Sequence, residues 1–215
     1  MTWLNQLEKM PLIAVVRAPT LAQGYQLATC ALAGGVTSVE IAWTTPQAAE
    51  LVQRLCQAFP AAAIGVGTIL TQQQLNQAAI AGAAFAFAPH TDPELIQTAR
   101  SLQLPIIPGA LTPTEIVTAW QAGATAVKVF PIQAVGGAAY LRAIAAPLGQ
   151  IPLIPTGGVT LAQTPDYLRA GAIAVGLGSQ LFLAEAVARQ DWAGITAQIR
   201  QGCDRVLRSV NRSQP

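Results

Sequence analysis

Short apolar runs alternate with longer amphipathic stretches along almost the whole chain. The apolar runs are rich in Val, Ile and Ala, which is typical of buried strands. The stretches between them carry apolar residues at helical spacing, and many begin at Thr or Pro and end at Gly. This pattern predicts strands over residues 13–17, 36–43, 64–69, 85–89, 105–109, 126–131, 152–158 and 174–179. It predicts helices over residues 3–10, 21–32, 48–59, 72–81, 93–102, 113–122, 137–148, 165–170 and 181–210, the last with a break near Asp191.

Strict alternation of strands and helices predicts a parallel sheet covered by helices. A repeat supports the count of eight units, because Gly35, Gly82, Gly123 and Gly171 precede every second strand at roughly even spacing. We therefore predict an α/β fold in which residues 1–215 form one (β/α)₈ TIM barrel domain after a short lead-in helix. The alternative is an open doubly wound sheet, which should show a Gly-x-Gly-x-x-Gly turn after its first strand, and none follows Arg17.

The amino-acid composition limits the kinds of binding partner that we expect for this chain. Only 10% of the 215 residues are charged, while 52% are hydrophobic, so we expect self-association to cover part of the surface. The net charge of +2 comes from scattered arginines, and the basic run at residues 205–212 is typical of a solvated helix face. We expect no nucleic-acid partner. The absence of a signal-like N-terminus and of a long apolar stretch predicts a cytoplasmic protein without membrane contact.

Cysteine and histidine usage argues against a metal centre. The three cysteines lie far apart without CxxC spacing, and His90 is the single histidine. This pattern favours a reducing compartment over a disulfide framework or a metal site. A lone loop histidine is usually unremarkable, so His90 is not a catalytic candidate. We expect neither metal nor organic cofactor.

Three charged residues stand within the predicted strands, namely Arg17, Glu40 and Lys128. Lys128 lies in the middle of an apolar strand, where an ammonium ion is costly to bury. Burial lowers the pKa of a lysine, and a neutral amine can attack a ketone to form a Schiff base. Glu40 shares its strand face with the small residues Ser38 and Ala42, which leave room for a general acid/base. The alternatives are a lysine that reaches solvent or a structural Glu40–Lys128 ion pair, which would stabilise weakly.

Further candidates follow from the rule that barrel enzymes work at the carboxyl ends of their strands. Glycine-rich turns after the last two strands predict a phosphate site, where backbone N–H groups and a helix N-terminus meet an anion. Arg17 can pair with a carboxylate, and threonine hydroxyls can hydrogen-bond a carboxylate or carbonyl. Trp43 is more typical of the core, whereas Phe130 fits either core or substrate wall. The predicted phosphate-binding residues are Gly157, Gly158, Gly178 and Ser179, and the predicted substrate-binding residues are Arg17, Thr68, Pro89, Phe130 and Thr156.

Nine segments give the chain a resemblance to a known family. They are AVVRA at 14–18, VEI at 39–41, GVGT at 65–68, APH at 88–90, PG at 108–109, TPTE at 112–115, KVFP at 128–131, PTGGV at 155–159 and GLGS at 176–179. The chain resembles, over nearly its whole length, the class I aldolases acting on 2-keto-3-deoxy-6-phosphogluconate (KDPG) and 4-hydroxy-2-oxoglutarate (KHG). The resemblance implies a trimeric barrel in which Lys128 forms the Schiff base and Glu40 relays protons. It also implies a pyruvate end at Thr68, Phe130 and Thr156, and a phosphate end at Gly157, Gly158 and Ser179.

The chain departs from the family at Thr44, where several members carry a carboxylate-binding arginine. We expect Arg17 to take the carboxylate or to position Glu40 instead. The expected reaction is reversible cleavage of KDPG to pyruvate and glyceraldehyde 3-phosphate, or of KHG to pyruvate and glyoxylate, or both. Three alternatives stay open: a 2-keto-3-deoxy-6-phosphogalactonate aldolase, another sugar-phosphate barrel enzyme such as an epimerase, and a barrel that binds keto acids or sugar phosphates without turnover.

Overall fold

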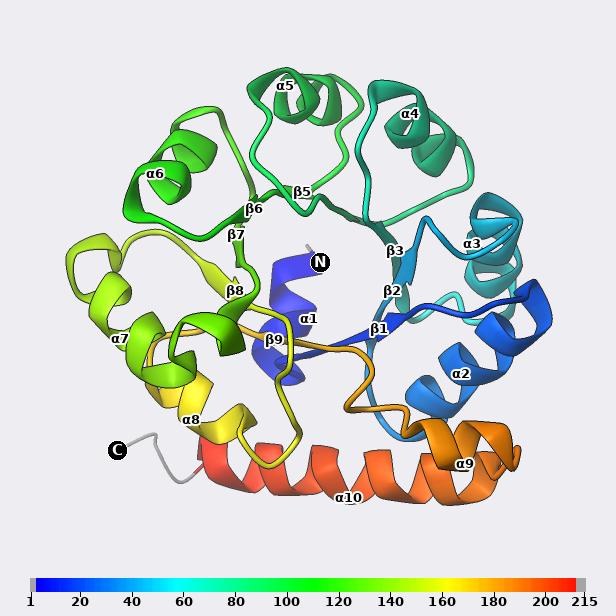
Figure 1. The fold of residues 1–215 in the computed structure, drawn as a ribbon. Coiled ribbons are helices and arrows are strands. Elements are labelled where there is room, and N and C mark those ends of the chain that lie inside the picture. The colour runs from blue at the N-terminus through cyan, green and yellow to red at the C-terminus, as the bar shows by residue number, and fades with distance from the viewer. Residues whose placement is uncertain (1–2, 212–215) are drawn as a thin grey trace.

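The computed structural model describes residues 3–211 and shows a closed ring of parallel strands surrounded by helices (Figure 1). The strands are β1 (Leu12–Val16), β2 (Ser38–Ala42), β3 (Ala63–Gly67), β4 (Ala86–Phe87), β5 (Ile106–Ile107), β6 (Gly109–Ala110), β7 (Val127–Val129), β8 (Leu153–Pro155) and β9 (Val175–Leu177). The helices are α1 (Trp3–Lys9), α2 (Leu21–Ala33), α3 (Ala48–Ala58), α4 (Gln72–Ile80), α5 (Pro93–Ser101), α6 (Pro113–Gln121), α7 (Gly137–Leu148), α8 (Thr164–Arg169), α9 (Ala184–Ala188) and α10 (Trp192–Asn211), with a 3₁₀ turn η1 at Ile132–Val135.

Strand pairing closes the ring and excludes the open sheet. β1 pairs with β2 on one side and with β9 on the other, so the first strand has no free edge. The remaining strands run β2-β3-β4-β5 in one sheet and β6-β7-β8 in a second. A parallel bridge between Thr156 and Gly176 joins the second sheet to β9. The predicted (β/α)₈ barrel is therefore confirmed.

Three details differ from the sequence-based expectations. The fifth strand is split into β5 and β6 at Pro108, which lacks an N–H group for a continuous ladder. Arg17 lies one residue beyond the end of β1 rather than within the strand. The C-terminal helical region begins at Ala184 instead of residue 181. Its expected break near Asp191 is present between α9 and α10, where the Asp191 side chain accepts a hydrogen bond from the backbone N–H of Gly194 and so caps the start of α10.

The repeated glycines have a common backbone role. Gly35, Gly82, Gly123 and Gly171 each follow a helix and have φ between 88° and 103°. This left-handed conformation is strained for residues with a Cβ atom. The chain therefore turns back toward the barrel at the places that the glycine repeat predicts.

Helix α1 fills the amino end of the barrel. In Figure 1 this helix lies inside the ring of strands rather than in the outer layer of helices. Trp3 stacks on Phe85 with 4.3 Å between the ring centroids, and its indole N–H donates to Ser38 Oγ at 3.2 Å. Leu7 joins the same interior cluster, which also holds inward-facing side chains of the strands. With the amino end occupied, the main opening of the barrel lies at the carboxyl ends of the strands.

None of the helices between residues 3 and 211 combines the length and the hydropathy that a membrane span requires.

Candidate active site

A cavity of about 710 Å³ opens at the carboxyl ends of the strands. All eleven residues that the sequence predicts for the site line it. They are Arg17, Glu40, Thr68, Pro89, Lys128, Phe130, Thr156, Gly157, Gly158, Gly178 and Ser179. His90 and Trp43, which the sequence argues against as site residues, do not line it. The barrel thus brings together residues that are spread over more than two thirds of the chain.

Lys128 lies at the centre of β7, between β6 and β8. Its residue is 6% exposed, and its ammonium nitrogen lies 4.7 Å from the ring centroid of Phe130 and 5.8 Å from that of Phe87. Burial lowers the pKa of Lys128, the negative charge of Glu40 opposes this shift, and Arg17 lowers the pKa further. The surroundings therefore favour the neutral, nucleophilic amine more than water does.

Glu40 lies in the middle of β2 and is 2% exposed. Its carboxylate occupies the space above Gly67 of β3, where an added Cβ atom would lie only 1.6 Å from Glu40 Oε1. Burial raises the pKa of Glu40, and the positive charges of Lys128 and Arg17 work in the opposite direction. A buried carboxyl with a raised pKa is suited to exchanging protons near neutral pH.

Glu40 and Lys128 do not form a direct salt bridge. The ion pairs found within residues 3–211 are Arg54–Glu50 and Arg169–Asp166, both on the helical surface. The alternative of a structural Glu40–Lys128 ion pair is therefore not supported. The two groups influence one another's pKa across the cavity while each stays available for another partner.

Arg17 and Thr68 meet at the cavity rim. Arg17 Nη2 donates to Thr68 Oγ1 at 3.4 Å. Thr68 has φ of 61°, a left-handed conformation that is an outlier for a β-branched residue. Such strain persists where the surroundings enforce it, and it concentrates at functional sites. Here it accompanies a hydroxyl that lies beside the one arginine lining the cavity.

Thr156, directly after β8, presents a buried hydroxyl without a partner. The residue is 8% exposed, and its Oγ1 atom has no hydrogen bond within the described residues. Gly176 of β9 makes room for it, since a Cβ atom there would approach Oγ1 to 2.5 Å. An unsatisfied buried hydroxyl is costly, which makes this atom a candidate partner for a ligand in the cavity that Thr156 lines.

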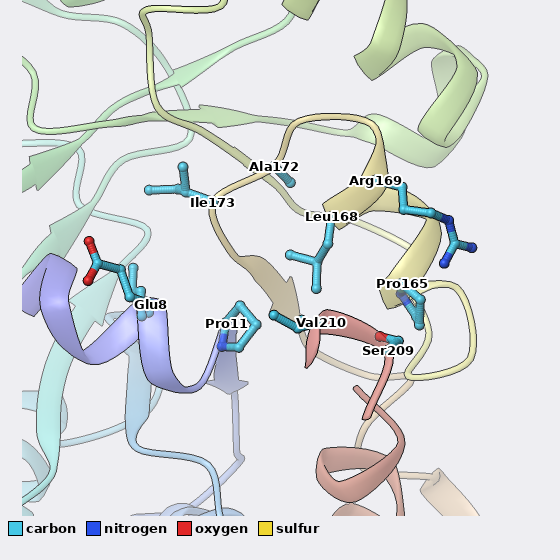
Figure 2. A pocket seen from close by; sticks show the side chains of 10 residues that line it. Glu8, Pro11, Pro165, Leu168, Arg169, Ala172, Ile173, Ser209 and Val210 are labelled. Carbon is cyan, nitrogen blue, oxygen red and sulfur yellow. The ribbon is translucent and has the colours of Figure 1, made fainter. Parts of the chain in front are cut away.

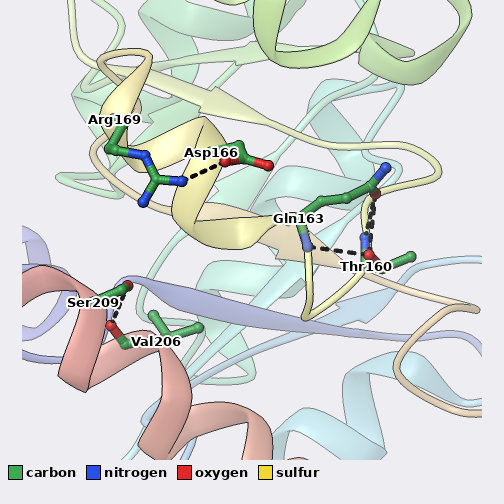
Figure 3. Close-up of polar contacts among 6 residues, drawn as sticks. All are labelled: Thr160, Gln163, Asp166, Arg169, Val206 and Ser209. Carbon is green, nitrogen blue, oxygen red and sulfur yellow. Dashed lines mark hydrogen bonds and ion pairs between the residues drawn. The ribbon is translucent and has the colours of Figure 1, made fainter.

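The turn after β8 exposes backbone groups to the same cavity. Gly157 and Gly158 have φ of 100° and 78°. Just beyond them, the Gln163 side chain accepts from the backbone N–H and the hydroxyl of Thr160 (Figure 3). These bonds hold the segment between the glycine turn and α8. The turn after β9, with Gly178 and Ser179, faces the cavity from the neighbouring strand.

The two turns differ in how they lead to the next helix. Neither continues directly into one, because α8 begins only at Thr164 and α9 only at Ala184. The start of α9 still reaches the cavity, since Ala184 lines it together with Gly178 and Ser179.

Sequence reasoning missed the cavity wall formed by α2, the loop after β9, and α9. Its residues include Gln23, Leu27, Phe182 and Val187. Gln23 and Leu27 are four residues apart and so share one helix face, but many buried faces have the same spacing. Nothing in the pattern distinguishes a cavity wall from the core.

A second, smaller cavity of about 280 Å³ lies at the opposite end of the barrel. Its wall is mainly apolar and includes Pro11 before β1, Ile173 before β9 and Val210 near the end of α10, while Glu8 and Arg169 stand on opposite sides of it (Figure 2). It holds no buried lysine or carboxylate. No group of three or more His, Cys, Asp or Glu residues among residues 3–211 is arranged to hold a metal ion.

The fold and the larger cavity define a (β/α)₈ barrel with a lysine–carboxylate site at the carboxyl ends of its strands. The family model for KDPG and KHG aldolases matches residues 4–198, and the chain belongs to this family. It is 35% identical to the 2-dehydro-3-deoxy-phosphogluconate aldolase of Dickeya dadantii over 89% of this chain and 90% of that one. It is 33% identical to the KHG/KDPG aldolase of Escherichia coli K12 over 90% of this chain and 91% of that one.

A solved structure extends the likeness to three dimensions. The KDPG aldolase of Legionella pneumophila, with pyruvate captured as a covalent carbinolamine intermediate, superposes with a TM-score of 0.82 and 30% identity. The match covers 92% of this chain and 96% of that one. A carbinolamine is the adduct of an amine and a ketone, so that relative forms the type of intermediate expected here.

Proposed function

We propose that this protein is a class I aldolase that cleaves KDPG reversibly to pyruvate and glyceraldehyde 3-phosphate, KHG to pyruvate and glyoxylate, or both. One observation carries the proposal: Lys128 is buried in the large cavity with a lowered pKa, near Glu40 yet without a salt bridge to it. A nucleophilic amine and a separate proton carrier are what Schiff-base aldol chemistry needs. Membership of the aldolase family supports the same reaction over a barrel that binds without turnover.

In the proposed mechanism, the neutral Lys128 amine attacks the 2-keto carbon of the substrate and forms a carbinolamine. Glu40 supplies the proton for loss of water, which leaves an iminium ion. Glu40 then takes the proton of the C4 hydroxyl, the C3–C4 bond breaks and the electron pair moves toward the iminium nitrogen. The aldehyde leaves, and the remaining enamine is protonated and hydrolysed to pyruvate and free Lys128. No metal or organic cofactor takes part in these steps.

The remaining site residues take binding roles in this proposal. Arg17, supported by Thr68, binds the substrate carboxylate. Thr44 is exposed and does not line the cavity, which supports a transfer of this task to Arg17. The unpartnered Thr156 hydroxyl bonds the pyruvate part of the substrate, and Phe130 and Pro89 form its wall. The phosphate-binding donors are at Gly157, Gly158, Gly178 and Ser179.

We further propose that the chain is one domain and acts in the cytoplasm as a homotrimer. The low charged fraction supports self-association. Size-exclusion chromatography with light scattering measures the oligomeric state, and a monomer would overturn this part of the proposal.

Borohydride reduction with pyruvate tests the lysine mechanism. Intact mass and peptide mapping should find a pyruvate-derived adduct on Lys128. Cleavage of KDPG, its galactonate epimer and KHG, measured through released pyruvate, then ranks the substrates. If saturating pyruvate left the folded protein unmodified, the lysine mechanism would be wrong. An adduct without cleavage of any of the three acids would exclude the proposed substrates and keep the chemistry.

A further inference from the structure

The segment that follows the lysine strand β7 packs directly on the glycine turn after β8. The backbone N–H of Ile132 donates to the carbonyl of Thr156 at 3.0 Å, and that of Gln133 donates to the carbonyl of Gly157 at 3.3 Å. An added Cβ atom at Gly158 would lie 2.8 Å from Gln133 Cβ, so the stem of Gln133 fits there only because residue 158 lacks a side chain. Gln133 does not line the cavity and therefore contacts the turn from outside it.

The side chain of Gln133 is itself held by a buried tyrosine. The Tyr167 hydroxyl of α8 donates to Gln133 Oε1 at 2.8 Å, and Tyr167 is 1% exposed. Gly137, at the start of α7, makes room for this bond, since a Cβ atom there would lie 3.1 Å from the hydroxyl. Burial raises the pKa of Tyr167, so its phenol stays a donor across the neutral range. Gln133 is an exposed residue, and a long exposed side chain keeps one conformation only where a specific partner holds it.

The shape of the glycine turn matters because the charged residues that line the cavity come from other parts of the barrel. They are Arg17, Glu40 and Lys128, which belong to β2, to β7 and to the position after β1. A phosphate at the glycine turn therefore relies on neutral donors, chiefly backbone N–H groups. Glycine adopts φ of either sign, so such donors converge on one anion only if neighbouring groups fix the turn.

We propose that Gln133 and Tyr167 are positioning residues for the phosphate-binding turn, and that they set a preference for 4-hydroxy-2-keto acids that carry a phosphate. This inference rests on the aldolase function proposed above. Tyr167 fixes the Gln133 side chain, Gln133 fixes the turn, and the N–H groups of Gly157 and Gly158 then meet the phosphate without first reorganising. Neither positioning residue lines the cavity. Their loss should therefore weaken recognition of the phosphate and leave the chemistry at Lys128 unchanged.

Cleavage of KDPG and of the same acid without its phosphate, 2-keto-3-deoxygluconate, tests the proposal. The ratio of the two kcat/KM values isolates the contribution of the phosphate. Tyr167→Phe keeps the ring and removes the hydroxyl, and it should lower this ratio about ten-fold by raising KM for KDPG. The kcat for KDPG, cleavage of KHG and borohydride trapping of pyruvate on Lys128 should not change.

A second variant removes the other partner of the bond. Gln133→Met keeps an unbranched stem against Gly158 but lacks the acceptor, so it should lower the ratio by the same factor. The double variant should be no worse than either single one, because both changes break one interaction. Gln133 is exposed, so Gln133→Met keeps the test decisive if Tyr167→Phe folds poorly.

Tyr140→Phe is the matched control. The Tyr140 hydroxyl donates to the carbonyl of Leu111, and Tyr140 does not line the cavity, so this variant should keep the ratio of the wild type. Equal ratios in Tyr167→Phe and Tyr140→Phe would overturn the inference and keep the aldolase function. A wild type that cleaves the two acids equally well would do the same. A wild type without a pyruvate adduct on Lys128 would overturn the aldolase function, and this inference with it.

Discussion

Each end of the barrel contains a cavity, and the charged groups at the two cavities differ in burial and in pairing. At the carboxyl end, Lys128 and Glu40 are buried without a salt bridge, in a cavity of about 710 Å³. At the amino end, the cavity of about 280 Å³ has Arg169 at its side, and this arginine is paired with Asp166 (Figure 3). Both members of that pair are more than half exposed. Charged groups are thus paired and hydrated at the amino end, whereas at the carboxyl end they are buried and available to a ligand.

Packing shows the same contrast. At the amino end, α1 inserts Trp3 and Leu7 between the strands, and the Trp3 N–H finds Ser38 as a partner. At the carboxyl end, Thr68 is strained and the Thr156 hydroxyl lacks a partner within the described residues. Strain and unsatisfied polar atoms lower stability, and they persist where they serve binding or catalysis. The comparison supports the proposal that the carboxyl end of the barrel carries the chemistry, while the amino end stabilises the fold.

The two lysines of the chain provide the sharpest test of this contrast. Lys128→Met should lower aldol cleavage by about 10⁴-fold or more, since the covalent intermediate is lost. Lys9→Met, at the exposed end of α1, should leave turnover unchanged. Steady-state release of pyruvate measures both. Comparable activity in the two variants would contradict a functional difference between the two ends of the barrel.

The same pair predicts a pH-dependent difference in stability. The pKa of Lys128 is lowered in the folded protein, so the unfolded chain binds this proton more tightly. Wild-type stability should therefore rise as the pH increases from the lowered pKa toward the ordinary lysine value. Lys128→Met should melt at a higher temperature than the wild type at neutral pH, and the gap should narrow toward pH ~10. Melting curves across this range measure the gap.

Glu40→Gln should have the next largest effect, lowering kcat by about 10²- to 10⁴-fold through loss of the proton carrier. The carboxylate accepts a proton only when ionised, and burial raises its pKa. Activity of the wild type should therefore fall on the acid side at a pH above that of an ordinary glutamate. A pH–rate profile of kcat/KM measures this limb. Persistence of the same limb in Glu40→Gln would assign it to another group.

Two threonines compare an unpartnered hydroxyl inside the site with one outside it. Thr156→Val and Thr37→Val each remove a buried Oγ1 atom that has no partner within the described residues. Each should raise the free energy of unfolding by about 1 kcal/mol. Only Thr156→Val should weaken pyruvate binding, by about ten-fold. Chemical denaturation and pyruvate titration of borohydride trapping measure the two effects, and equal binding in both variants would exclude Thr156 as a ligand.

The last comparison substitutes one arginine at each end of the barrel, and the substitution at the amino end should have the smallest effect. Arg169→Gln breaks an exposed pair, so it should change stability by less than about 1 kcal/mol and leave kcat/KM unchanged. Arg17→Gln should raise KM by about ten-fold or more, because it removes the partner of the substrate carboxylate. Kinetics of KDPG or KHG cleavage distinguish the two. An unchanged KM in Arg17→Gln would mean that Arg17 does not bind the carboxylate and that backbone donors do so instead.

Much of the architecture follows from local patterns. Apolar runs, helix caps such as Thr71 and Thr112, and the turn glycines predict eight strand–helix units with small errors at their ends. The errors have local causes as well, such as the missing N–H of Pro108, which divides the fifth strand. The rule that barrels place chemistry at the carboxyl ends of strands pointed to eleven of the residues that line the cavity.

The chain by itself determined the order of elements, the barrel and the identity of the unusual residues, because these depend on periodicity, turn chemistry and the cost of burying charge. Tertiary structure decided what local patterns do not encode. It separated Glu40 from Lys128 while keeping both buried, left the Thr156 hydroxyl without a partner among residues 3–211, and filled the amino end with Trp3. It also joined α2 and α9 into one wall of the cavity. These features arise from distances between segments far apart in the chain, and only closure of the ring sets those distances.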